Sequence, residues 1–287
     1  STISVSSRSG PMAITTIDGA LAGMQPPRFF SKGVTATLVA GRPASLWALG
    51  GAPGAGGFDT SLNGVTLSST SALVNGQIPH YDPASGNAYL ARFAAKATQP
   101  GVVMLMDRLW HNGGYTITST SAQSITSPTW PSRCPTSGTD DTAATTGHGV
   151  YLAMEISAAT GAGTPTITVT YTNSAGTGSR TATNIIATVA SSAIGATYFI
   201  GLQAGDVGVR SVQSVQLSAT WTSGTMNLVA YRLITSVVCG AAFVDGEADI
   251  LTGGRPRLYD GTVPWLVFQP NTTTASNISG VYQETHG

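Results

Sequence analysis

The sequence predicts an all-β protein: an antiparallel β-sandwich, jelly-roll-like, with an extended and irregular N-terminal arm. Three observations support this fold class. Segments rich in Thr, Val, Ile and Tyr recur about every ten to fifteen residues from position 88 onward. Glycine-rich turns such as TNSAGTGS (172–179) and QAGDVG (203–208) separate these segments. Glycine and proline dominate the front of the chain, where no regular periodicity is found.

Residues 1–70 are predicted to form the arm and its loops. The stretches GMQPPRFFSKG (23–33) and GRPASLWALGGAPGAGG (41–57) suit neither a regular helix nor a central strand, because proline lacks an amide proton and glycine is entropically costly to order. Their apolar side chains are too many for a solvated tail, so we expect the arm to lie against the body or a neighbour. Removal of residues 12–33 is expected to leave the sandwich folded. The residues expected to contact a partner are Met24, Pro26, Pro27, Arg28, Phe29, Phe30 and Trp47.

Residues 71–287 are predicted to form the sandwich body as a single domain. The apolar run GVVMLMDRL (101–109) is typical of a strand buried on both faces. In TITVTYT (166–172) apolar and Thr residues alternate, as on a half-buried strand. The alternation slips once in VRSVQSVQLSATW (209–221), which indicates a bulge or a change of sheet. Alanine-rich NAYLARFAAKAT (87–98) could be a helix, and the chain past 240 is expected to be irregular before a last polar strand.

Charge excludes some classes of partner. Lys plus Arg and Asp plus Glu number 13 each, so the formal net charge is zero, which argues against nucleic acid and anionic membranes as partners. Only 9% of residues are charged. A surface of hydroxyls, small residues and backbone suits a protein that buries much of its outside against copies of itself or a partner.

Two further sequence features concern compartment and redox state. The sequence has no apolar window long enough to span a membrane, and its opening residues lack the apolar core of a signal peptide, so a soluble, non-exported chain is expected. The two cysteines, Cys134 and Cys239, have no metal-ligand spacing and are expected to be free thiols rather than a disulfide.

The stretch LMDRLWHNGGYT (105–116) has the residue types of an active site. Asp107 and His111 could form an acid–base pair, with Arg108 holding an anion. Neighbouring residues of a strand point to opposite faces, however, so Asp107 and Arg108 are expected to find separate partners. We therefore interpret the stretch as a strand and its closing turn.

The remaining motifs are weaker. The histidines at 80, 148 and 286 have no partner at metal-ligand spacing, and DGEAD (245–249) lacks the ligand spacing of a calcium loop. No catalytic residue, cofactor or metal site is predicted, and the chain is not expected to be an enzyme.

Several long strings resemble a family of tailed-bacteriophage virion proteins. The likeness extends over most of the chain. The strings that carry it are MAITTIDGALAGMQPPRFFSKG from Met12, MDRLWHNGGYTITSTSAQSI, YTNSAGTGSRTAT, LQAGDVGVRSVQSVQLS, NLVAYRLI and GRPRLYDGTVPWLVF. The resemblance implies a structural protein of the phage head, made in the host bacterial cytoplasm. It further implies a decoration or cement protein on the capsid exterior, bound to the major capsid protein and to copies of itself, as a homotrimer or a lattice-linked oligomer. It offers no catalytic residue.

Two other functions remain open at this point. A tail, fibre or host-surface adhesin would also be β-rich, but sequence repeats or an aromatic carbohydrate platform would be expected of it. A glycan hydrolase would need paired carboxylates in a cleft, and no such pair stands out in the sequence.

Overall fold

The computed structural model describes residues 14–71, 74–125, 133–136 and 143–287. Within these ranges the chain is almost entirely antiparallel β-structure, which confirms the predicted fold class. Met12, the residues before it and parts of the loops on either side of Cys134 lie outside the described residues. The elements outside the two main sheets are α1 (Ile17–Ala22), the short 3-10 turn η1 (Val74–Gly76) and the small hairpin β8 (Cys134–Pro135) and β9 (Ala143–Ala144).

A six-stranded sheet forms one layer of the sandwich. Its strands follow the order β16-β5-β19-β1-β3, and β17 also pairs with β5. The bounds are β1 (Arg28–Lys32), β3 (Gly51–Ala52), β5 (Ala88–Ala97), β16 (Gly246–Asp249), β17 (Arg257–Leu258) and β19 (Ile278–His286).

An eleven-stranded sheet forms the rest of the β-structure. Its order is β2-β18-β6-β15-β10-β13-β12-β11-β14-β7, with β4 paired to β6. The bounds are β2 (Ala44–Ser45), β4 (Val65–Thr66), β6 (Gly101–Asn112), β7 (Gln123–Ser124), β10 (Val150–Ala158), β11 (Ile167–Asn173), β12 (Arg180–Asn184), β13 (Thr197–Gly201), β14 (Val209–Leu217), β15 (Thr225–Cys239) and β18 (Pro264–Pro270).

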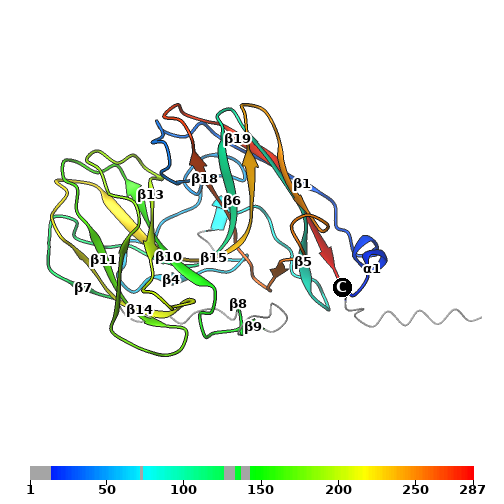
Figure 1. Ribbon diagram of the computed structural model, residues 1–287, viewed down its shortest axis with the longest axis horizontal. Coiled ribbons are helices and arrows are strands. Elements are labelled where there is room, and N and C mark those ends of the chain that lie inside the picture. The colour runs from blue at the N-terminus through cyan, green and yellow to red at the C-terminus, as the bar shows by residue number, and fades with distance from the viewer. Residues whose placement is uncertain (1–13, 72–73, 126–132, 137–142) are drawn as a thin grey trace, which may run out of the picture.

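The two sheets enclose two main apolar cores, which share the long strands β6 and β15. Figure 1 shows one lobe built from β10 to β14 and another from β1, β5 and β19, with β6, β15 and β18 between them. In the first core the six-stranded sheet packs against β6, β15 and β18, through residues such as Phe93, Leu105 and Phe268. The second core lies where the long sheet curls back on itself, so that β10 and β15 face β11 and β14. Most of β6 is buried on both faces, as the apolar run 101–109 predicts, and so are residues 226–232 of β15. A third apolar cluster, which includes Met106, Val229 and Tyr231, covers the opposite face of these strands.

The segment predicted to be an arm is built into this body. Strand β1 lies between β19 and β3, and its Phe30 and Lys32 are buried. Residues 17–22 form a helix whose Thr16 side chain accepts a hydrogen bond from the Gly19 amide at 3.0 Å. The expectation that residues 12–33 are dispensable for folding is wrong, because deleting them would remove a paired strand and part of the first core.

Two further expectations are corrected and one is confirmed. The alanine-rich segment 87–98 is strand β5, not a helix, since tertiary packing of its apolar residues outweighs alanine's helix propensity. Residues 264–270, expected to be irregular, form β18 between β2 and β6, and the prolines that suggested irregularity stand at the strand's two ends. The slip in 209–221 is a bulge, because the register between β11 and β14 shifts twice.

Candidate functional site

The structure separates the seven predicted contact residues into exposed and internal ones. Pro26 and Pro27 are exposed, and Phe29 is 65% exposed on β1. Met24 and Arg28 are half-buried, and Met24 forms an isolated bridge to β19. Phe30 and Trp47 are buried in the core of the fold. The expectation that these two side chains contact a partner is therefore wrong.

Phe29 and Phe30 differ because β1 is a regular strand. Successive side chains of a strand point to opposite faces. Phe30 therefore enters the first core, where its ring stacks on Phe93 with the ring centroids 5.8 Å apart, while Phe29 points away from that core.

Trp47 is covered by the glycine-rich stretch that follows it. Its indole Nε1 donates a hydrogen bond to the Gly57 carbonyl oxygen at 2.7 Å. A Cβ atom on Gly56 would come within 2.3 Å of the indole ring, so only glycine allows the loop to lie this close. The arrangement explains the glycine at position 56, a signal of close packing that sequence reasoning missed.

Phe29 lies on the outer face of the six-stranded sheet. Phe29, Val281, Ala94 and Glu247 lie in register across β1, β19, β5 and β16. We call this surface the Phe29 face and define it by the row above together with Ser31, Ser279 and Lys96 of the next row. It contains a shallow depression of about 160 Å³ beside Phe29. At the edge of the face next to β16, the end of β15 and the turn after it expose more apolar side chains, namely Val238, Phe243 and Val244.

Arg28 forms an ion pair with a buried carboxylate of the same chain, so its charge is not free to bind a partner. Its Nη1 lies 2.8 Å from Oε1 of buried Glu284, which is also 2.8 Å from Nδ1 of buried His80. The second Glu284 oxygen, Oε2, lies 3.1 Å from Nε2 of His286, and Asp82 lies 3.1 Å from Nε2 of His80. Burial by itself would raise the pKa of Glu284, but the hydrogen bond from His80 and the charges of His80 and Arg28 outweigh it, and the pKa is lowered. The cluster ties β1 and the loop at 80 to the C-terminal strand.

Asp107, Arg108 and His111 do not assemble a common site. Asp107 accepts a hydrogen bond from Arg133 Nε at 3.0 Å, whereas Arg108 Nη2 lies 2.6 Å from Glu155 Oε2. The expectation of separate partners is confirmed. His111 accepts from Arg108, and burial together with the Arg108 charge keeps the pKa of this imidazole well below its usual value. All these side chains lie inside the protein, so they are placed to stabilise the interior.

Asp249 of the DGEAD motif has a structural role, and so do the two cysteines. Asp249 of DGEAD caps its own turn by accepting hydrogen bonds from the amides of Leu251 and Thr252, and the described residues contain no group of three His, Cys, Asp or Glu side chains arranged to hold a metal. Cys134 and Cys239 are buried free thiols, as predicted. Among the described residues no helix is long and apolar enough to cross a membrane.

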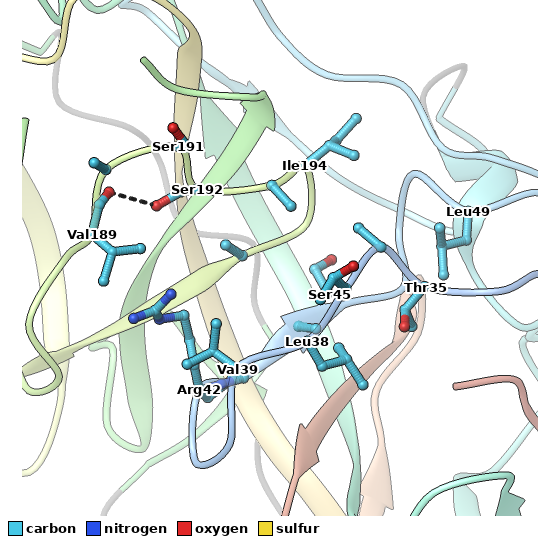
Figure 2. Close-up of a pocket in the computed structure, with 17 residues that line it drawn as sticks. Thr35, Leu38, Val39, Arg42, Ser45, Leu49, Val189, Ser191, Ser192 and Ile194 are labelled. Carbon is cyan, nitrogen blue, oxygen red and sulfur yellow. Dashed lines mark hydrogen bonds between the residues drawn. The ribbon is translucent and has the colours of Figure 1, made fainter. Parts of the chain in front are cut away.

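A second hollow, which sequence reasoning missed, lies between the two lobes (Figure 2). The segment 35–49 forms one wall and the loop 189–196 forms the other, around a cavity of about 280 Å³. Arg42 lines this cavity, and most other side chains there are apolar or small. The signal in the sequence is slight, because Arg42 is one charged residue in a glycine- and proline-rich stretch.

The chain was compared with models of protein families, with curated proteins and with solved structures, and none of these comparisons gave a match.

Proposed function

We propose that this chain is a structural protein of a tailed-bacteriophage virion. In this proposal it is a decoration protein that binds the outside of the major capsid lattice, stabilises the phage head and contacts copies of itself. The resemblance of its long sequence strings to phage virion proteins supports the assignment, and its low charge fits a protein that buries much of its surface.

The observation that carries the proposal furthest is the exposure of Phe29. A phenylalanine that projects from a sheet face gains free energy when a partner covers it, by about 1.5–3 kcal/mol. The small side chains beside it, Ala94 and Ser279, let another surface approach the sheet closely. Arg92 and Glu247 pair with each other at 2.6 Å on the same face. Their charges therefore neutralise each other at the rim of the Phe29 face. These features favour the Phe29 face as the surface toward the lattice.

Copy number tests the assignment to the head. In purified particles of the phage that carries this sequence, quantitative mass spectrometry should find the chain at a copy number comparable with that of the major capsid protein. A few copies per particle, located at the tail, would instead identify a tail or fibre adhesin. Cleavage of host polysaccharide by the purified protein would also contradict the proposal.

Substitution of Phe29 tests the docking face. Phe29→Ser should weaken binding to heads prepared without the protein by about tenfold or more, because a buried aromatic contact is lost at each site. Ile185→Ser is the matched control, since Ile185 is 67% exposed but follows β12 in the other lobe. Equal binding by the Phe29→Ser and Ile185→Ser variants would exclude the Phe29 face as the contact surface.

A further inference from the structure

The cavity between the lobes has the lining of a small-ligand site. The segment 35–49 and the loop 189–196 enclose about 280 Å³, close to the lower limit of typical small-molecule pockets. The apolar side chains that line it are Leu38, Val39, Leu49, Val189 and Ile194. Figure 2 shows Arg42 beside Val39, on the same side of the cavity as Val189.

Arg42 is a buried cation without a counter-charge in the described part of the chain. The residue is only 7% exposed, and its Nε has no hydrogen-bond partner. No carboxylate of the described residues lies within ion-pair distance of it. Its guanidinium carbon lies 5.4 Å from the centre of the Tyr198 ring, a cation–π contact that offsets part of the cost of burial. A buried charge normally has an ionic or hydrogen-bonding partner, so an anion in the cavity would stabilise Arg42.

The walls of the cavity are held in place before any ligand arrives. The Arg42 amide donates to the Val39 carbonyl oxygen at 2.9 Å, which closes the turn that carries the side chain. On the opposite wall Ser191 has a left-handed backbone with φ of 54°, and its amide donates to the Gly161 carbonyl at 2.9 Å. Ser192 lies 2.6 Å from the Tyr198 hydroxyl oxygen and so fixes the ring beneath Arg42. A preformed site of this kind loses little entropy on binding.

We propose that this cavity binds a carboxylate carried on a short aliphatic group. A carboxylate matches the planar donors of a guanidinium, and it carries one charge, as Arg42 does. The aliphatic part would pack against the apolar side chains of the two walls. The volume corresponds to about nine water molecules, enough for a chain of about six carbons. This inference is independent of the proposed virion role.

The probe for the test is hexanoate, added to the full-length protein and followed by NMR. We expect saturable shifts of the methyl signals of Leu38, Val39 and Ile194. Hexan-1-ol, which has the same chain without the charge, should bind about tenfold more weakly or worse, because it lacks the charged partner for Arg42. Hexylamine should not bind, since its charge repels the guanidinium. Equal affinity for hexanoate and hexan-1-ol, or shifts that do not saturate, would overturn the proposal.

Variants locate the effect at Arg42. Arg42→Gln should reduce hexanoate affinity by about tenfold or more, whereas Arg210→Gln, at an exposed arginine on β14, should leave it unchanged. Without ligand the Arg42→Gln variant should have a melting temperature no lower than the wild type, because it removes an uncompensated buried charge. Wild-type affinity in Arg42→Gln would refute the site. If this variant does not fold, the hexanoate, hexan-1-ol and hexylamine series on the wild-type protein decides the question. Head binding is a separate assay, so its failure would leave this result unaffected.

Discussion

Replacing Glu155 by alanine should be one of the most damaging single changes in the protein. Glu155 Oε2 lies 2.6 Å from Arg108 Nη2, and both side chains are completely buried. The guanidinium lies between the rings of Trp47 and Trp265, with its central carbon 4.4 and 4.9 Å from the ring centres. Its only other side-chain hydrogen-bond partner among the described residues is His111, whose imidazole is neutral. Glu155→Ala would therefore leave the Arg108 charge buried without a counter-charge.

The expected cost is about 3–5 kcal/mol of unfolding free energy. At about 2 °C per kcal/mol for a chain of this size, the melting temperature should fall by about 6–10 °C. Urea unfolding at neutral pH, followed by tryptophan fluorescence, measures the free energy, and calorimetry measures the melting temperature.

The exposed pair Arg92–Glu247 provides the matched control. Its Nε–Oε1 distance is also 2.6 Å, but both side chains are nearly half exposed. Glu247→Ala should cost at most about 1 kcal/mol, because water solvates the arginine that remains. Replacing both Arg108 and Glu155 by apolar residues should restore much of the stability lost in Glu155→Ala. A loss below about 1 kcal/mol for Glu155→Ala, or equal losses for the two alanine variants, would refute this account of the interior.

Two further predictions concern titratable groups. The lowered pKa of Glu284 means that its contribution to stability is present above its unfolded value near 4.5 and is lost as the pH falls through the lower folded value. Glu284→Gln should therefore cost more at neutral pH than below pH 4.5 in chemical denaturation, and a pH-independent cost would contradict the assignment. Burial raises the pKa of the thiols of both Cys134 and Cys239. Neither thiol should react readily with Ellman's reagent at mildly alkaline pH in the native state, while denaturation should release two reactive thiols. Rapid reaction of the native protein would show that the thiols are accessible.

Local patterns in the sequence predict the strands better than they predict the partners of each strand. The alternation rule separates Asp107 from Arg108, and the apolar run around them predicts burial on both faces. Their partners, Arg133 and Glu155, lie 26 and 47 residues further along the chain, and no local pattern indicates these pairings. Only the tertiary fold brings these groups together.

The predicted contact surface shows the same limit. The prolines at 26 and 27 indicate irregular chain, and in irregular chain Phe29 and Phe30 could both face a partner. In the strand that forms, alternation lets only one of them remain exposed. Trp47 is predicted at a partner surface because its glycine-rich neighbours indicate irregular chain. The spacing that allows Gly56 to lie against its ring depends on the folded path of that loop. Arg42 was missed for a similar reason, since its burial depends on the loop 189–196.

The strand order of the six-stranded sheet also restricts when the protein can fold during synthesis. Strand β19, which ends one residue before the last, lies between β5 and β1, whose residues are made about two hundred positions earlier. Until β19 has left the ribosome, β1 and β5 have no strand between them and Phe30 and Phe93 cannot complete their core. This layer therefore forms only after β19 has been made, and deleting residues 278–287 would remove the strand that joins β1 to β5.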